Sequence, residues 1–156
     1  MEKTNVMRIL EQKKIKYNSY YYGDTNAISG IEVARVLRQD FNQVFKTLVT
    51  VGSSKKHYVF MVPVASELDL KKASMIVGEK SISMLPAKEL LHFTGYVHGG
   101  CSPIGMKKQF PVIVNISAKE YSTIIFSAGK IGYQVEVSVL DLEEKMQYLF
   151  ASIVEE

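Results

Sequence analysis

Helical and strand periods alternate along the first third of the chain. Apolar residues at helical spacing predict a helix over residues 3–13. Side chains that alternate in character predict a strand over residues 16–22. Ser29 and Glu32 form a capping-box pattern, in which the serine accepts from the helix amides and the glutamate reaches back. We therefore expect a second helix to begin at Ser29.

The middle of the chain reads as a hairpin followed by a helix and a short strand. Two β-rich runs, 45–51 and 57–64, flank a polar loop and predict the hairpin. Asp69 is suited to cap the start of a helix, and Gly78 is suited to follow its end. The residues after Gly78 predict a short strand over 81–84.

The last part of the chain adds more strands and fewer helices. Pro86 suits the first turn of a brief helix. Strands are predicted over 112–116, 123–127 and 133–139, and a closing helix over 141–150. Several neighbouring strands are joined by links too short for a parallel crossover. We expect an α/β (α+β) fold with one strongly curved sheet of about seven strands, mixed or largely antiparallel, flanked by helices.

Length and composition fit a single domain over residues 1–156, and 47% hydrophobic residues can form a substantial core. No apolar run approaches the roughly 20 residues of a membrane helix, and the start of the chain lacks a signal-peptide layout. One cysteine cannot form an internal disulfide, so we expect a cytoplasmic protein. The net charge of +3 suits a nucleic-acid partner and an ordinary basic surface equally well.

Lys46 stands alone in an uncharged stretch of the predicted hairpin. Strand alternation puts Lys46 on the same face as Val44 and Leu48. If that face points inward, Lys46 is a partly desolvated cation that needs an anionic or polar partner. If it points outward, Lys46 is an ordinary surface lysine.

A glycine-rich run over residues 94–105 is the second candidate for chemistry. Consecutive backbone amides in such a run can form an anion-binding nest or an oxyanion hole. The run lacks the Gly-Lys-Ser/Thr ending of a Walker loop and the spacing of a dinucleotide fingerprint. A tight structural turn is the alternative. The small-residue bend at 127–132 is either a hairpin turn or a second wall of the same pocket.

The remaining reactive side chains form no recognisable constellation. The three histidines have no metal-ligand spacing with one another or with Cys101, so we predict neither a metal nor a cofactor. Cys101 has no helix start or fixed histidine beside it to lower its pKa, which favours a small, semi-buried residue over a nucleophile. The tyrosines at 20–22 could line a pocket or stack on a base, or simply belong to a strand and the core.

Several segments together resemble the YbaK/EbsC family of trans-acting aminoacyl-tRNA deacylases, which is related to the editing domain inserted in bacterial prolyl-tRNA synthetases. The resemblance runs from residue 3 to about 153 and is carried by residues 45–48, 67–72, 94–96, 99–105 and 127–130. It implies a curved mixed sheet, no cofactor, and the 3′ aminoacyl-adenosine of a mischarged tRNA as substrate. In the YbaK branch the amino acid is cysteine attached to tRNA(Pro), with Cys-tRNA(Cys) as a further candidate substrate, and a synthetase such as prolyl-tRNA synthetase can supply selectivity for the tRNA. The sequence predicts no oligomeric state.

The resemblance also implies site residues. Lys46 matches the family's essential lysine, which holds the ester or the adenosine–phosphate end, and Gly99 and Gly100 match the segment whose amides face the ester carbonyl. A tyrosine at the end of the first strand is expected, with Tyr22 favoured by ungapped alignment and Tyr20 left open. The other expected substrate-binding residues are Thr47, Cys101, Ser102, Pro103, Ser127 and Gly129.

Two residues depart from the family pattern and bear on specificity. Cys101 replaces a residue that is commonly aliphatic, and Ile131 replaces a common arginine. Another mischarged substrate, such as Ala-tRNA(Pro), and a non-catalytic tRNA- or nucleotide-binding module therefore stay as alternatives. The sequence has no obvious general base, which fits a substrate-assisted reaction. In the resembling enzymes the cysteine thiol attacks its own ester, and a cyclic thiolactone leaves the tRNA.

Overall fold

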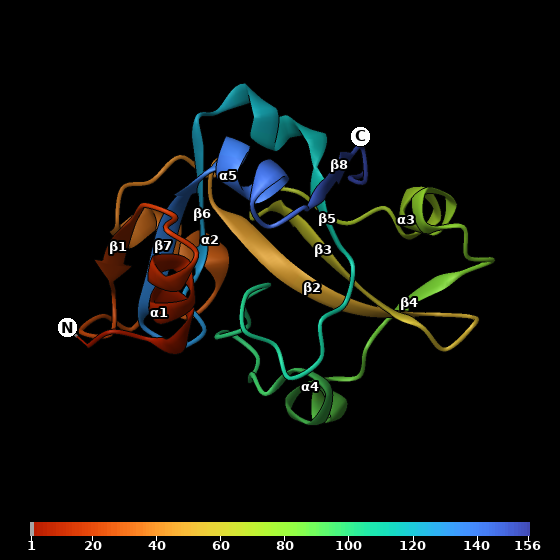
Figure 1. Cartoon of the computed structure of the whole chain (residues 1–156), viewed down its shortest axis with the longest axis horizontal. Coiled ribbons are helices and arrows are strands. Elements are labelled where there is room, and N and C mark those ends of the chain that lie inside the picture. Colours follow the sequence, from red (N-terminus) through yellow and green to blue (C-terminus); the bar gives the residue numbers. More distant parts are fainter. Residues whose placement is uncertain (1) are drawn as a thin grey trace.

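Two sheets form the framework of the molecule (Figure 1), which we describe over residues 2–156 from a computed structural model. The smaller sheet is antiparallel, in the order β1-β7-β6. The larger sheet is mixed, in the order β4-β2-β3-β5-β8, and its parallel pairs are β3 with β5 and β5 with β8. The strands are β1 (Tyr17–Tyr21), β2 (Phe45–Gly52), β3 (His57–Pro63), β4 (Ile82–Met84), β5 (Val112–Asn115), β6 (Thr123–Ser127), β7 (Tyr133–Ser138) and β8 (Leu149–Ala151).

The expectation of a single seven-stranded sheet is therefore wrong. The two sheets meet where an isolated parallel bridge joins Val44, just before β2, to Ile125 in β6. The Ile125 amide donates to the carbonyl of Gln43 at 3.0 Å, and the pairing does not continue into a ladder. Strand twist accumulates along a ladder. Two sheets packed against a shared core therefore bury more apolar surface than one extended, twisted sheet would.

Two of the helices begin at capping residues that the sequence predicted, Ser29 and Asp69, whereas the cap at Thr4 was not predicted. Thr4 caps α1 (Asn5–Gln12), and the Ser29–Glu32 capping box opens α2 (Gly30–Val36). Asp69 accepts from two amides at the start of α3 (Leu70–Val77), and Gly78 follows the helix with a left-handed φ of 75°. The remaining helical elements are α4 (Ala87–Thr94), the 3-10 helix η1 (Ile116–Glu120) and α5 (Val139–Glu144).

The predicted closing helix over 141–150 is wrong in its second half. The α5 helix ends at Glu144, and Gln147 adopts a left-handed φ of 59° that no helix continues through. The chain then forms β8, which pairs with β5 in parallel, while Tyr148 turns into the core. The apolar residues of this segment therefore serve strand pairing and burial in place of a helical stripe.

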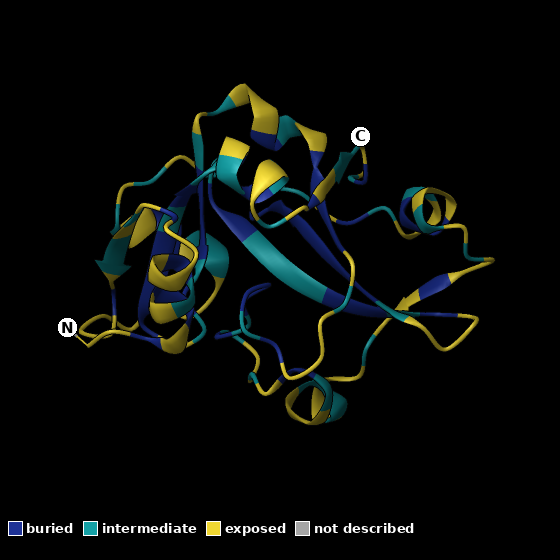
Figure 2. Ribbon diagram, in the orientation of Figure 1, coloured by how far each residue is buried: buried dark blue, intermediate teal, exposed yellow. Residues whose placement is uncertain are grey.

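The main core lies between the two sheets. It unites buried side chains of α1, β2, β3, β5, β6 and β7 in one cluster. A second cluster on the other side of the larger sheet includes Phe60, Leu68, Ala73, Ile113 and Ile153. Figure 2 shows that the middle of β2 is only half-buried although both of its flanking stretches and its neighbour β3 are buried. This half-buried stretch marks the place where the core opens to a cavity.

Candidate functional site

A cavity of about 600 Å³ lies over the centre of β2. Its walls come from β2, the start of α2, the segment that leads into α4, the loop at 98–101, and the paired strands β6 and β7. Both sheets therefore contribute to one site, and Val44, whose bridge to Ile125 joins the two sheets, is among the lining residues. The lining is mostly apolar, with a few polar groups, as is typical of small-molecule sites.

Lys46 lies on β2 at the wall of this cavity. Its Nζ is 3.5 Å from Glu67 Oε1, and its side chain is 30% exposed against 76% for that of Glu67. All residues from Val44 to Val49 line the cavity, so Lys46 lies at the cavity wall with only part of its side chain open to solvent. Of the two sequence interpretations, the partly desolvated cation with an anionic partner describes the structure.

The glycine-rich run forms another wall of the cavity in a tight turn. The Gly100 amide donates to the Val97 carbonyl at 3.0 Å, and Gly99 adopts a left-handed φ of 88°. An added Cβ at Gly100 would lie 3.1 Å from the backbone nitrogen of Ile131, so this turn is packed against the bend after β6. In the described part of the chain the amides of Gly99 and Cys101 donate to no acceptor, and both residues line the cavity.

Tyr22, Thr47 and Ser127 also line the cavity. Tyr22 is 5% exposed, and its amide donates to the Gly132 carbonyl at 2.8 Å. Thr47 Oγ1 is buried without a partner within residues 2–156, which leaves a hydroxyl available to a ligand. Ser127 Oγ accepts from the Gly129 amide at 3.1 Å, which fixes the bend that follows β6.

Five predicted site residues are outside this lining. Tyr20 lies on β1, the strand that ends one residue before Tyr22. The Tyr20 hydroxyl donates to Glu136. The other four, Gly100, Ser102, Pro103 and Gly129, are near neighbours in the sequence of the lining residues Cys101 and Ser127. Ser102 Oγ accepts from the Ile104 amide at 3.3 Å, and Gly129 has a left-handed φ of 86°. These residues shape the wall through backbone geometry.

Cys101 lines the cavity as a free thiol. Burial raises the pKa of this thiol from its ordinary value of 9.0 to about 12. The thiol is therefore protonated at neutral pH and is a poor nucleophile. Its position makes it a small, weakly polar part of the wall.

Two polar lining residues were missed by residue-level reasoning. Gln134 is 5% exposed, and its Oε1 accepts from Gln39 Nε2 at 2.8 Å. Gln134 on β7 pairs with Ser127 on β6. A hairpin between these two strands would place the two residues opposite each other, so the hairpin interpretation of the bend could have identified Gln134. Glu67 entered the sequence interpretation only as part of a matching segment, because its approach to Lys46 depends on a long-range contact.

The site carries no arrangement suited to a metal ion. Within residues 2–156, no group of three or more histidine, cysteine, aspartate or glutamate side chains is placed to hold one. None of the helices formed by these residues is long and apolar enough to cross a membrane.

Known proteins resemble this chain in sequence and in fold. Residues 25–145 match the family described as the aminoacyl-tRNA editing domain. EbsC of Enterococcus faecalis, named as a candidate Cys-tRNA(Pro)/Cys-tRNA(Cys) deacylase, is 46% identical over 138 residues, which cover 88% of this chain and 84% of that protein.

Two solved structures have the same fold. A candidate trans-editing enzyme for prolyl-tRNA synthetase has a TM-score of 0.81 at 23% identity, over 97% of this chain and 95% of that chain. A hypothetical protein has a TM-score of 0.88 at 18% identity, over 96% of this chain and 99% of that chain. The mixed α+β fold is thus that of editing domains, as predicted. With most of its length inside the family match, the chain belongs to the aminoacyl-tRNA editing family, and its function is the editing of aminoacyl-tRNA.

Proposed function

We propose that this protein removes cysteine from mischarged Cys-tRNA(Pro), and from Cys-tRNA(Cys), by cleaving the aminoacyl ester in trans. The observation that carries the proposal is the cavity, which is lined by one lysine and by a turn with two backbone amides that have no partner within residues 2–156. The choice of cysteine rests on the 46% identity to EbsC, whose name specifies these two substrates.

The chemistry needs little beyond positioning and charge stabilisation, because an aminoacyl ester is already activated. In the proposed reaction the amides of Gly99 and Cys101 stabilise the oxyanion that develops on the ester carbonyl. Lys46 supplies positive charge at the ester end of the substrate. Such preorganised donors are effective because they need no reorganisation as the charge develops.

The attacking group in this proposal is the thiol of the substrate. Its sulfur forms a bond to the carbonyl carbon, the bond from that carbon to the ribose oxygen breaks, and the thiol proton ends on the ribose oxygen. The products are a cyclic thiolactone and free tRNA. The protonated Cys101 thiol is unsuited to this role, which favours a nucleophile brought by the substrate.

The partner in this proposal is the 3′ aminoacyl-adenosine end of tRNA, and prolyl-tRNA synthetase supplies selectivity for the tRNA body. A cavity of this volume holds an aminoacyl group and its nucleoside, and not the rest of a tRNA. The place of action is the cytoplasm, where charged tRNA is used.

A panel of aminoacyl-tRNAs tests the proposal. We expect the purified protein to release tRNA from Cys-tRNA(Pro) and to act on Ser-tRNA(Pro) at least about 100-fold more slowly, because a hydroxyl is a much weaker nucleophile than a thiol at neutral pH. Mass spectrometry of the released amino acid should detect the thiolactone or its hydrolysis product. Equal rates for the cysteinyl and seryl esters, or preferential action on Ala-tRNA(Pro), would contradict the proposal.

A further inference from the structure

Glu67 is the one carboxylate among the residues that line the cavity, all of which lie within residues 2–156. Its Oε1 is 3.5 Å from Lys46 Nζ, so the cavity presents a negative and a positive group side by side. An aminoacyl ester presents the complementary pair. Its α-amino group is protonated in part near neutral pH, and its carbonyl oxygen lies on the adjacent carbon.

We propose that Glu67 binds the α-ammonium group of the aminoacyl ester while Lys46 holds the ester end. The inference rests on the proposed function and adds to it the recognition of a free amine. It predicts that the enzyme acts on aminoacyl-tRNA and discriminates against N-acylated aminoacyl-tRNA, which has lost the cation.

The backbone of Glu67 is held by a second strand-like segment at residues 153–155. The Glu155 amide donates to the Glu67 carbonyl at 3.0 Å, and the Asp69 amide donates to the Ile153 carbonyl at 2.8 Å. An antiparallel bridge joins Leu68 to Val154 between these bonds. Because side chains alternate along such a pairing, the burial of Leu68 leaves Glu67 directed away from the apolar cluster.

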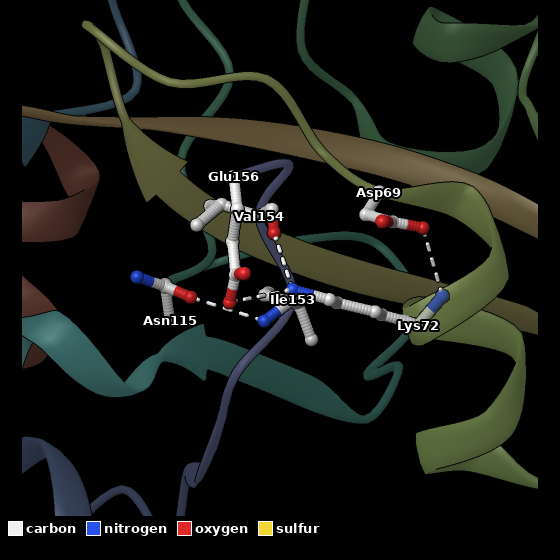
Figure 3. Close-up of polar contacts among 6 residues, drawn as sticks. All are labelled: Asp69, Lys72, Asn115, Ile153, Val154 and Glu156. Carbon is white, nitrogen blue, oxygen red and sulfur yellow. Dashed lines mark hydrogen bonds and ion pairs between the residues drawn. The ribbon is translucent and has the colours of Figure 1, made fainter.

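Figure 3 shows how this segment is held from both sides. The Lys72 side chain extends from α3 and donates to the Val154 carbonyl at 2.9 Å, and it also pairs with Glu156 at 3.4 Å. On the other side, Asn115 Oδ1 accepts from the Ile153 amide at 3.1 Å. Neither contact involves Glu67 itself. Together they fix the partner strand against which Glu67 is placed.

The exposure of Glu67 suits a group that exchanges partners. Its side chain is 76% exposed, so moving from Lys46 to a substrate ammonium leaves no buried charge unpaired. The same exposure limits the strength of the contact, since solvent screens ion pairs at a surface. We therefore expect an effect of several-fold and not of many orders of magnitude.

The test compares Cys-tRNA(Pro) with N-acetyl-Cys-tRNA(Pro) in wild-type protein and in Glu67→Gln. We expect wild-type kcat/KM to favour the free amine by about fivefold or more, and Glu67→Gln to bring the ratio close to one. Glu144→Gln, an exposed carboxylate on α5 outside the cavity lining, is the matched control and should keep the wild-type ratio. A Glu67→Gln variant with the wild-type ratio would overturn the inference.

A binding measurement separates this inference from the proposed function. Adenosine that carries cysteine through a 3′ amide cannot be cleaved as an ester, and its Kd and that of its N-acetyl form can be measured by calorimetry. We expect wild-type protein to bind the free-amine compound about fivefold more tightly than the acetylated compound. Glu67→Gln should bind the two compounds with equal Kd. Equal binding of both forms by the wild type, or no binding of either, overturns the role of Glu67. Failure of the wild type to deacylate Cys-tRNA(Pro) overturns the proposed function alone.

Lys72→Met tests whether the segment at 153–155 positions Glu67. The substitution removes both contacts of the Lys72 ammonium and keeps the length of the side chain. We expect the free-amine preference to fall part of the way toward that of Glu67→Gln, at an unchanged KM for the acetylated substrate. Lys71→Met, at the exposed neighbouring position, should keep the wild-type preference. An unchanged preference in Lys72→Met would show that Glu67 needs no such support.

Discussion

The two sides of the cavity are built in opposite ways. One side is a turn of small residues, Gly99 to Cys101, whose geometry is set by backbone hydrogen bonding and close packing against Ile131. The other side is a pair of long charged side chains, Lys46 and Glu67, that meet near solvent. A rigid backbone suits the stabilisation of a fixed oxyanion position, and exposed charges suit the exchange of partners. In the function that we propose, the turn stabilises the oxyanion, while the charged rim holds the ester end and the ammonium group of the substrate.

The largest expected effect comes from Lys46→Ala, which tests whether the rim also contributes to catalysis. We expect kcat/KM for Cys-tRNA(Pro) to fall by roughly 10²- to 10³-fold, because a charge that stabilises the transition state is lost. The circular dichroism spectrum should stay unchanged, since within residues 2–156 the ammonium forms its one ion pair with the exposed side chain of Glu67.

His98→Ala is the matched contrast, because His98 also lines the cavity but is exposed. We expect less than about a threefold change, whereas loss of a general base would cost roughly 10²- to 10⁴-fold. A large loss in His98→Ala with little loss in Lys46→Ala would reverse the comparison and assign the chemistry to a histidine base.

The rigidity of the turn is tested by Gly100→Ala. The new methyl group would press on the Ile131 backbone at 3.1 Å, so the turn must shift and carry the amides on either side with it. We expect kcat to fall roughly tenfold, since small misplacements of catalytic groups are costly.

Gly78→Ala serves as its control, because that glycine also precedes a bend but has open space around it. The left-handed φ of 75° should cost about 1 kcal/mol of stability in urea unfolding, with kcat unchanged. Equal kcat values for Gly100→Ala and wild type would show that the turn tolerates movement. The contrast between a rigid turn and exchangeable charges at the rim would then be wrong.

The smallest effect concerns the Cys101 thiol within the turn. Its pKa is raised by burial from 9.0 to about 12, so the folded protein holds this proton more tightly than the unfolded chain does. Its contribution to the free energy of unfolding is present below pH 9 and is lost as the pH rises toward 12. The stability difference between wild type and Cys101→Ser should therefore shrink over this range, as measured by urea unfolding. A constant difference would mean that the turn admits solvent to the thiol.

Features of the fold that depend on residues close together in the sequence could be predicted, and features that depend on distant residues could not. Caps such as Asp69 and Gly78 act within one helical turn, and the β2–β3 hairpin is joined by a short loop, so the sequence predicted both. The division into two sheets depends on a single bridge from Val44 to Ile125, which no local pattern specifies. The strand β8 was missed because its partner β5 lies far away in the sequence.

The site followed the same rule. Lys46 and the glycine-rich run stood out because a lone cation in an apolar stretch and clustered glycines are local signals. Gln134 and Glu67 are ordinary polar residues in their own segments, and only the assembled walls give them a place in the cavity. Residue type and alternation alone did not distinguish Tyr20 from Tyr22. The structure does so, because Tyr20 pairs with β7 within β1, whereas Tyr22 follows the end of that strand.

The pairing of β1 with β7 has a consequence for folding kinetics. The Tyr20 hydroxyl and Glu136 are 116 residues apart in the sequence, so this edge of the smaller sheet closes one of the longest loops in the chain. The hairpins β2–β3 and β6–β7 connect neighbouring segments and can form early, whereas closing so long a loop costs more entropy. We expect the cavity, which needs both sheets and the turn that follows β1, to be completed in the last and slowest phase of refolding. Recovery of activity should then lag behind recovery of secondary structure when the denatured protein is diluted into buffer.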